Sequence, residues 1–420
     1  MSVIDDLKAL NGEQRSAFLA SFLGWTLDAF DYFLLTFVFK DIAADFHVPI
    51  SSVQGAIFLT LVARPFGAVV FGWLADKFGR RPILMIDVLL YSVLELASGF
   101  APTLMALLVM RTLFGFVMGG EWGIGASLAL ESIPARSRGI VSGILQEGYA
   151  VGQLLGALVF AFAYPHFSQW VPHIASWRVL FVVGVIPALL VFYIRRNVKE
   201  SPAFELSKAK GHRGLDVIRT LGRHWKLVIY AVALMAAFNF FSHGTQDNYA
   251  TFLQVQHHFT PGLVGLLTVI MNMGAIVGGL TFGAWSERIG RRKAITIAAL
   301  LALPIIPLWA FATTPILLAL GGFLLQIAVQ GAWGVVPVHL NELSPEDARG
   351  TFPGAAYQFG NLIAARAVPI QGKLAESHNN NYGFALAVVA GVAAVVLAVL
   401  TWFGPEAKGV AFVKDAPQEG

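Results

Sequence analysis

The ten residues GWLADKFGRR, at positions 72–81, recur as GAWSERIGRR at 283–292, which is 211 positions further along the chain. A second pair of segments has the same spacing, since ESIPARSRG at 131–139 matches ELSPEDARG at 342–350. Two independent stretches that share one offset indicate a duplicated unit. Duplicated helical units with a site between them at the membrane midplane are typical of transporters.

The composition predicts a membrane protein. Of the 420 residues, 56% are hydrophobic and only 13% are charged, against about 25% in soluble domains. Apolar runs of about twenty residues, the length that crosses a bilayer, recur twelve times. They lie near 17–39, 52–75, 82–100, 104–129, 139–163, 175–194, 227–253, 262–285, 294–311, 315–338, 351–374 and 381–403. We expect an all-α membrane protein with twelve transmembrane helices in two pseudo-symmetric six-helix halves.

Loop charge predicts the orientation. If both termini are cytoplasmic, the cytoplasmic loops hold nineteen Lys and Arg and the opposite loops three, as the positive-inside rule requires. The net charge of +4 lies in these loops and does not indicate a nucleic-acid partner. We expect a multi-pass protein of the cytoplasmic (inner) membrane. Its predicted parts are a cytoplasmic segment 1–16, a bundle 17–194, a basic linker 195–226, a second bundle 227–403 and a cytoplasmic tail 404–420.

One apolar run carries a polar face. Within NFFSHGTQDNYAT, at 239–251, Asn239, His243 and Asp247 are spaced i, i+4, i+8 and share a face, with Ser242 and Gln246 beside them. Polar groups at membrane depth are costly and mark function by default, and His titrates near neutral pH. We predict a proton site here. The alternative is a hydrogen-bonding seam between helices.

Two acidic residues of the first run are further candidate proton carriers. Asp28 and Asp31 share a helix face beside Tyr32, and the repeat places them opposite Asn239 and Ser242. Burial and a neighbouring carboxylate both favour the protonated form of a carboxyl group. We favour Asp31 slightly over Asp28; a purely structural role is the alternative for either residue.

Two arginines lie inside apolar runs. Arg111 has a permanent charge and a planar fork that matches a carboxylate, and the repeat places Gly322 at the equivalent position. This asymmetry suits substrate binding, with a structural ion pair as the alternative. Arg64 is either a cavity residue or the partner of an acid in the first run. The sequence does not separate these two roles.

Amides and further polar residues complete the predicted cavity. Gln358 and Asn361 share a face and suit hydrogen bonds to a hydroxyl or keto oxygen. Glu95 is expected to be structural. The candidate cavity residues are Arg64, Tyr32, Glu121, Gln146, Glu147 and Tyr149.

The loop charges predict a different role. Paired charges at helix ends tune the equilibrium between inward and outward states; they are Asp76, Arg80, Arg81, Glu287, Arg291 and Arg292. No metal-ligand spacing and no nucleophile–base pair stands out in the sequence. We therefore expect neither a metal site, a cofactor nor an enzyme.

Several motifs resemble those of a known family. GWLADKFGRR resembles the loop signature of the major facilitator superfamily, and Arg111 with Gly115 and Gly119 is similar to its helix 4 signature. NFFSHGTQDNYAT matches every fixed position of the N-x-x-S/T-H-x-S/T-Q-D-x-x-x-T signature of Jen-type lactate and pyruvate permeases, which belong with the sialate:proton symporters. GWTLDAFD at 24–31, QEGYAVGQLL and FPGAAYQFGN also resemble that branch. Glu121 and Glu147 look more like the sialate and osmolyte symporters.

The resemblance implies a cavity lined by helices 1, 4, 7 and 10. We predict a monomer in the bilayer that imports a small monocarboxylate anion, of the lactate or pyruvate type, together with a proton. In this hypothesis Arg111 binds the carboxylate, and the remaining substrate contacts come from Asn239, His243, Gln246, Gln358 and Asn361. The proton candidates are Asp28, Asp31, His243 and Asp247. The main alternative is a proton symporter for sialic or aromatic acids, and a receptor that does not transport is a more distant one.

Overall fold

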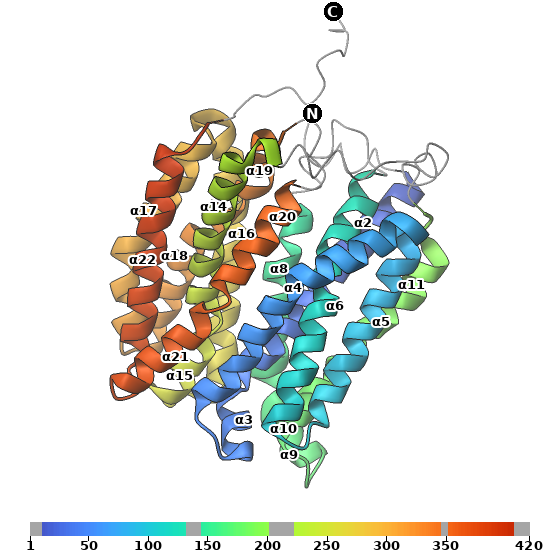
Figure 1. The fold of residues 1–420 in the computed structure, drawn as a ribbon. Coiled ribbons are helices and arrows are strands. Elements are labelled where there is room, and N and C mark those ends of the chain that lie inside the picture. Colours follow the sequence, from blue (N-terminus) through green and yellow to red (C-terminus); the bar gives the residue numbers. More distant parts are fainter. Residues whose placement is uncertain (1–10, 132–143, 201–221, 346–351, 407–420) are drawn as a thin grey trace, which may run out of the picture.

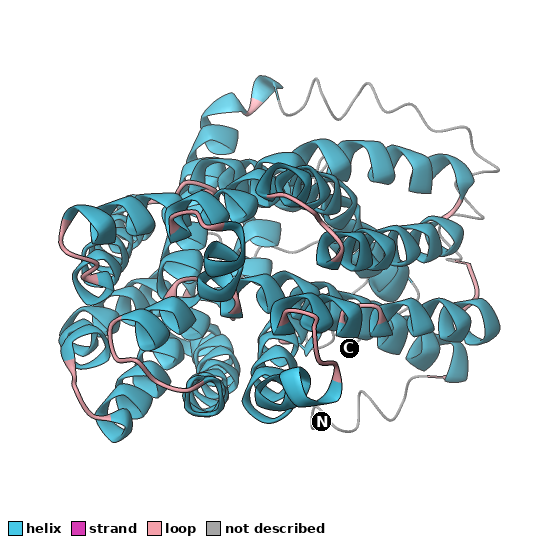
Figure 2. Cartoon of the chain, turned by 90° about the horizontal axis from the view of Figure 1, so that it is seen from below, coloured by secondary structure: helices cyan, strands magenta, loops and turns pink. Residues whose placement is uncertain are grey.

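The computed structural model describes residues 11–131, 144–200, 222–345 and 352–406. This part of the chain is helical with short loops and contains no strand (Figure 2). Eleven of its helices are long and apolar enough to cross a membrane. The remaining predicted span, 351–374, is divided at Ala365 and Arg366 into two shorter helices, α20 (Phe352–Ala364) and α21 (Ala367–Ser377).

The N-terminal half packs around α6 (Leu104–Glu131), which contacts α2 (Gly12–Phe37), α4 (Ile50–Phe78) and α5 (Arg80–Gly99). The helix α8 (Gly148–Leu158) lies against α2. The remaining elements are α3 (Phe39–Phe46), η2 (Val159–Ala163), η3 (Tyr164–His166), α9 (Phe167–Trp170), α10 (Ser176–Val183), η4 (Ile186–Ala188) and α11 (Leu189–Asn197).

The C-terminal half packs around α18 (Pro315–Trp333), which contacts α16 (Pro261–Ile289) and α17 (Arg291–Phe311). The helix α22 (Tyr382–Phe403) contacts α17 and α14 (Trp225–Gln246), and α14 also contacts α20. The short helices α15 (Tyr249–Val255) and α19 (Val336–Leu343) complete this half.

The sequence repeat is visible in the backbone. Gly79 joins α4 to α5 with φ 110° and ψ 152°, and its repeat equivalent Gly290 joins α16 to α17 with φ 99° and ψ 155°. Residues with a Cβ rarely adopt such positive φ values. A glutamate caps each turn, since Glu200 accepts from the backbone N–H of Arg80 and Glu406 from that of Arg292. The duplicated motif therefore folds into the same turn in both halves.

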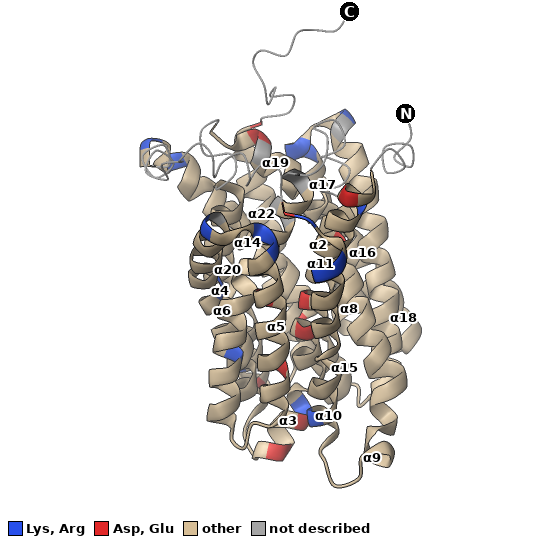
Figure 3. Ribbon diagram, turned by 90° about the vertical axis from the view of Figure 1, so that its right-hand side faces the viewer, with Lys and Arg blue, Asp and Glu red and all other residues tan. Residues whose placement is uncertain are grey.

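The two halves stand side by side (Figure 1). Between them, α4 contacts α20 and α21, and α8 with η2 contacts α16. We call the side where α2 begins and α22 ends the terminal side, and the other the far side. Figure 3 shows most Lys and Arg on the terminal side, as the loop-charge prediction requires. The assignment of that side to the cytoplasm stays a prediction.

The lipid-facing surface is apolar. Large hydrophobic side chains such as Val69, Trp73 and Phe192 are more than half exposed, and many others line the outer faces of the helices. A soluble protein rarely exposes apolar surface on this scale. The protein is an integral, multi-pass membrane protein.

Candidate functional site

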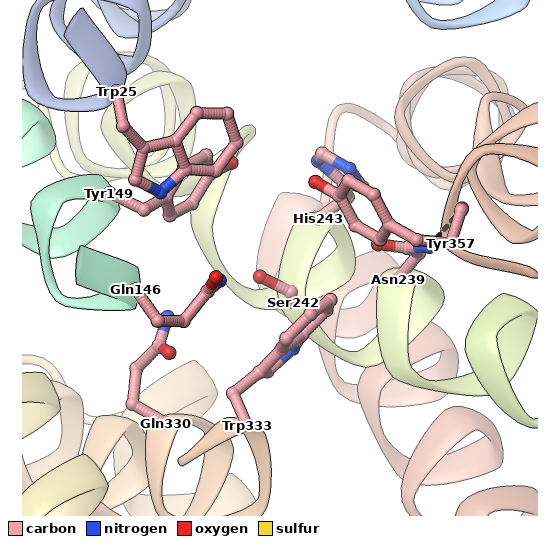
Figure 4. A pocket seen from close by; sticks show the side chains of 9 residues that line it. All are labelled: Trp25, Gln146, Tyr149, Asn239, Ser242, His243, Gln330, Trp333 and Tyr357. Atoms are coloured by element: carbon pink, nitrogen blue, oxygen red, sulfur yellow. Dashed lines mark hydrogen bonds between the residues drawn. The ribbon is translucent and has the colours of Figure 1, made fainter. Parts of the chain in front are cut away.

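A pocket lies between the two halves and contains about 290 Å³ of space not occupied by atoms. Side chains of both halves face one another across it, with Trp25, Gln146 and Tyr149 on one side and Asn239, His243 and Tyr357 on the other (Figure 4). Ser242, Gln330 and Trp333 complete the lining.

Aromatic rings form much of the pocket wall. Trp25 of α2 stacks on Tyr149 of α8, with ring centroids 5.6 Å apart. Across the pocket, Tyr357 of α20 meets Trp333 of α18 edge to face at 6.0 Å. Tyr357 also contacts Trp122 of the N-terminal half at 5.4 Å. These rings give the pocket broad flat surfaces in addition to its amides.

Arg64 of α4 lies directly behind this wall. Its guanidinium carbon is 6.0 Å from the ring centroids of both Trp25 and Tyr357. The side chain is buried, and neither Nε nor Nη2 has a hydrogen-bond partner in the described part of the chain. Among the acids, Asp28 acts on it electrostatically, but no ion pair joins them among the described residues. Arg64 is thus outside the pocket lining, beside two of the pocket rings and near an acid of α2, and its role stays a prediction.

Arg111 is engaged elsewhere. Its Nη2 donates to Oε2 of Glu95 at 2.5 Å and to Oγ of Ser98 at 2.8 Å. The guanidinium is sandwiched by Phe114 and Phe181, at 4.5 and 4.9 Å from their ring centroids. Arg111 does not line the pocket. The geometry favours the structural alternative, because Nε and Nη2 already donate to Glu95 and Ser98; a role of Arg111 in substrate binding stays a prediction.

The polar face of α14 forms a cluster at the boundary between the halves. Nδ1 of His243 lies 2.9 Å from Oδ2 of Asp247. Nε2 of His243 lies 3.4 Å from Oδ1 of Asn361, and the hydroxyl of Tyr32 reaches across from α2 to donate to Oδ2 of Asp247 at 2.8 Å. All four side chains are buried. The predicted i, i+4 spacing therefore brings His243 and Asp247, at the end of α14, into contact.

The acids of the N-terminal half lie outside the pocket lining. Asp28, Asp31 and Glu121 are fully buried, and none of their carboxyl oxygens has a hydrogen-bond partner among the described residues. Asp31 interacts electrostatically more strongly with Glu95 of α5 and with Asp28 than with Arg111. Both Asp31 and Glu95 lie beside Gly184, so Asp31 is on the side of α2 that faces α5. Asp28 lies nearer to the pocket, because it interacts with Arg64, which lies beside two of the pocket rings.

The predicted amides divide into two groups. Asn239 and Gln146 line the pocket. Gln246 instead donates to Gln326 of α18 at 3.0 Å. Nε2 of Gln358 lies 3.5 Å from the carbonyl oxygen of Gly119, and its Oε1 has no described partner. Glu147 is not in the pocket lining but lies against Gly279 of α16, across the boundary between the halves.

Profiles of known families match nearly the whole chain. The sugar (and other) transporter family matches residues 16–237, and the major facilitator superfamily matches residues 232–419. The chain belongs to the sugar transporter family of the major facilitator superfamily. The expectation that it is a transporter and not an enzyme is confirmed.

Relatives in this superfamily include organic acid transporters. A carboxylic acid transporter protein homolog of Saccharomyces cerevisiae is 28% identical and aligns over 95% of this chain and 67% of its own length. The sialic acid transporter NanX of Escherichia coli is 28% identical over 86% of this chain and 87% of its own. The xylose transporter XylE of E. coli, in a partially occluded inward open conformation, superimposes with a TM-score of 0.78. It is 20% identical and covers 96% of this chain and 100% of that one, which confirms the major facilitator fold.

The sequence of this major facilitator protein did not predict some of the residues that line the pocket. Gln330 and Trp333 of α18 and Tyr357 of α20 were not predicted, although all three line the pocket. Two signals were available in the sequence. Gln330 interrupts an apolar run, and Trp333 is the repeat equivalent of Trp122.

A second unpredicted cluster joins the halves on the far side. Gln54 of α4 donates to Asn248 at 2.6 Å, and Asn248 donates to Gln371 of α21 at 3.0 Å. Nε2 of Gln371 donates to the carbonyl oxygen of Gly244 at 2.6 Å. Gln254 adds a bond to the carbonyl oxygen of Phe37 at 2.9 Å. Two of these uncharged bonds, Gln54–Asn248 and Gln254–Phe37, join the halves between the pocket and the far side, and the bonds of Gln371 hold Asn248 in place within the C-terminal half.

The loop charges have partners within their own half. Arg81 donates to the carbonyl oxygen of Arg195, and Arg291 forms an ion pair with Glu342 at 3.1 Å. Arg292 donates to the carbonyl oxygen of Thr401. The side chains of Asp76 and Glu287 lie outside the described part of the structure. A gating role for these residues stays a prediction.

Proposed function

We propose that this protein carries an organic acid anion across the membrane together with a proton, by alternating access of the pocket to the two sides. The observation that carries the proposal is the placement of Arg64. It is a buried guanidinium with unsatisfied N–H groups, directly behind a pocket between the two halves. A guanidinium stays charged in proteins and presents a fork that matches a carboxylate. Unsatisfied buried donors are costly unless a ligand completes them.

The pocket supplies hydrogen bonds for the rest of the anion. Gln146, Asn239 and Gln330 present amides from three different helices, and Ser242 adds a hydroxyl. Amides both donate and accept hydrogen bonds, so they suit a hydroxyl or keto oxygen next to the carboxylate. In this assignment Arg64 takes the role that the sequence had suggested for Arg111.

The His243–Asp247 pair is the proposed proton site. Both ring nitrogens of His243 face acceptor oxygens, on Asp247 and Asn361. A ring with a proton on each nitrogen satisfies both acceptors, whereas the neutral ring satisfies only one. The transported proton balances the charge of the anion, and the loaded carrier then moves between its two states without the cost of burying a net charge.

For the substrate we propose a small monocarboxylate of the lactate or pyruvate type. The complete signature at 239–251 and the relative described as a carboxylic acid transporter homolog support this choice. With both termini in the cytoplasm, as predicted, the direction of transport is inward along the proton gradient.

The aromatic wall favours a second candidate, a sialic or aromatic acid. Trp25, Tyr149, Trp333 and Tyr357 offer stacking surfaces that a three-carbon acid leaves unused. Rings stack on such surfaces with a gain of about 0.5–1.5 kcal/mol beyond burial. The relative NanX is named as a sialic acid transporter.

Uptake into proteoliposomes tests the proposal. Labelled L-lactate is supplied under an inward proton gradient, with a protonophore control and with unlabelled pyruvate, sialic acid and benzoate as competitors. Gradient-driven uptake that pyruvate blocks supports the monocarboxylate. Gradient-driven uptake of sialic acid or benzoate, with no lactate uptake, supports the second candidate. Uptake of any of these acids that is unaffected by the protonophore contradicts the proton coupling.

A further inference from the structure

Tyr32 and His243 are repeat equivalents that touch each other. They are 211 positions apart, which is the offset of the duplicated motifs, and the Tyr32 hydroxyl lies 3.3 Å from Nδ1 of His243. Equivalent residues of two repeats meet only where the pseudo-two-fold axis passes between them. The proposed proton site therefore lies on the axis about which the two halves are related.

The Tyr32 hydroxyl bridges the two halves. It belongs to α2 of the N-terminal half and donates to Oδ2 of Asp247, in the C-terminal half, at 2.8 Å. The same Oδ2 lies 2.9 Å from Nδ1 of His243, whereas Oδ1 of Asp247 has no described partner. The Tyr32 hydroxyl and Nδ1 of His243 thus both lie against one carboxylate oxygen, and the hydroxyl comes from the opposite half.

The strength of this bond depends on whether the pair carries a proton. Without the transported proton, a neutral His243 and an ionised Asp247 have a net negative charge. Asp247 is ionised with or without that proton, but in the empty pair no cation lies beside it, so the Tyr32 hydroxyl donates to an uncompensated charge, and hydrogen bonds to ionised groups are the strong ones. Loading one proton removes the net charge, and the Nδ1–H of His243 then competes with Tyr32 for Oδ2. The bond from Tyr32 is therefore stronger when the pair is empty.

We propose that Tyr32 is a positioning residue that couples proton release to the meeting of the two halves at this point, an inference that rests on the proposed proton symport. The bond exists only while the halves are in contact on the far side. The bond stabilises the pair without its proton, and it exists only when the far side is closed. By linkage, the pair therefore binds the proton less tightly with the far side closed than with the far side open. The proton is thus taken up when the far side is open and released when it closes.

The surroundings of the pair contain few other charges. The ionisable groups that act on Tyr32 and Tyr149 here are Asp247, Arg64 from α4, Tyr357 from α20 and Asp28 from α2. From α18, the amide of Gln326 approaches through Gln246. These groups are unchanged by removal of one hydroxyl, so the variant Tyr32→Phe isolates the bond to Asp247.

The test separates proton-driven accumulation from exchange. Tyr32→Phe and the matched control Tyr91→Phe, whose buried hydroxyl has no described partner, are reconstituted with the wild type. Each is assayed for gradient-driven uptake and for exchange of labelled for unlabelled substrate at equal pH. For Tyr32→Phe we expect exchange close to wild type and gradient-driven uptake reduced about tenfold, the effect of one hydrogen bond to a charged group. We expect a more alkaline lumen to restore that uptake, because it drives proton release.

Three results overturn the inference. They are an equal loss of both activities in Tyr32→Phe, wild-type behaviour of Tyr32→Phe, and a defect that an alkaline lumen leaves unchanged. The double variant Tyr32→Phe/Asp247→Asn gives a second check. Comparing it with the wild type and both single variants separates the effect of the hydroxyl from a folding defect in any one protein. Loss of the hydroxyl is expected to cause no further loss of gradient-driven uptake once Asp247 is an amide, and an additive loss contradicts the inference. Absence of gradient-driven uptake in the wild type refutes the proposed symport instead.

Discussion

The two halves share one backbone plan but differ sharply in what they bury. The N-terminal half contains five fully buried acids within the membrane, Asp28, Asp31, Asp87, Glu95 and Glu121, together with the buried arginines Arg64 and Arg111. At the positions equivalent to Asp28 and Asp31, the C-terminal half has Asn239 and Ser242. Its contribution to the pocket is mainly amides, two aromatic rings and His243.

The difference shows how one duplicated unit can serve two purposes. The turns at Gly79 and Gly290 kept the same conformation, so the scaffold is conserved between the halves. In the proposed function, the charge that attracts an anion is in one half and the proton pair is in the other, while both halves supply hydrogen-bonding groups to the pocket. A substrate that needs both sets is bound only between the halves, where alternating access requires the site to be.

A second contrast lies within the N-terminal half, between its two arginines. Arg111 is paired with Glu95 and enclosed by phenylalanine rings. Arg64 has unsatisfied donors and two pocket rings beside it. The first arrangement is that of a structural ion pair and the second that of an incomplete binding site. The predictions below test these contrasts, from the largest expected effect to the smallest.

The variant Arg64→Gln is expected to lose uptake by about a hundredfold, because it removes the charged hydrogen bonds to the carboxylate. Arg64→Lys keeps the charge but not the fork and is expected to retain intermediate activity. Initial uptake rates and KM in proteoliposomes measure both. Normal KM and kcat in Arg64→Gln would remove Arg64 from the binding site.

The variant Arg111→Leu is expected to lose stability rather than specificity. It leaves Glu95 buried without its partner, which costs about 3–5 kcal/mol. The double variant Arg111→Leu/Glu95→Leu is expected to recover most of that loss, because apolar residues of similar size often replace a buried pair without penalty. Thermal unfolding in detergent measures both proteins. A stable Arg111→Leu single variant would contradict the structural assignment.

The variants His243→Gln and Asp247→Asn test the C-terminal half. Each removes the proton site but keeps a hydrogen-bonding side chain, so we expect exchange to persist while gradient-driven accumulation falls about tenfold or more. The matched control is Asp31→Asn, whose side chain lies away from the pocket on the α5 side of α2. Accumulation lost only in Asp31→Asn would move the proton site to the N-terminal half.

The smallest effect is expected on the far side. Gln54→Leu removes the hydrogen bond to Asn248 that joins the halves, worth about 0.5–1.5 kcal/mol. We expect the far side to open several-fold more often, measured as faster labelling of the single cysteine in Thr251→Cys, since the chain has no cysteine of its own. Gln326→Leu, which removes an amide inside the C-terminal half, is the control. Equal labelling rates in the two variants would show that this hydrogen bond does not hold the far side closed.

The sequence alone predicted the fold, which is confirmed, and the shared face of His243 and Asp247, but not the different packing of the two arginines. The repeated turn motif and the i, i+4 spacing of His243 and Asp247 are local patterns, and local patterns survive folding. Arg64 and Arg111 both lie in apolar runs, and only the packing of α5 on α6 reveals that Glu95 pairs with Arg111. The interruption between α20 and α21 was also missed, although Arg366 stands at it and Pro369 follows three residues later.

The most direct test of the central claim compares substrate binding by Arg64→Gln and by Arg111→Leu/Glu95→Leu. Both proteins are purified with the wild type, and binding of the acid transported by the wild type is measured by isothermal titration in detergent. The account predicts near wild-type affinity in the double variant and no measurable binding in Arg64→Gln. Retained binding in Arg64→Gln, with binding lost in a well-folded double variant, would return the anion site to Arg111 and contradict the account.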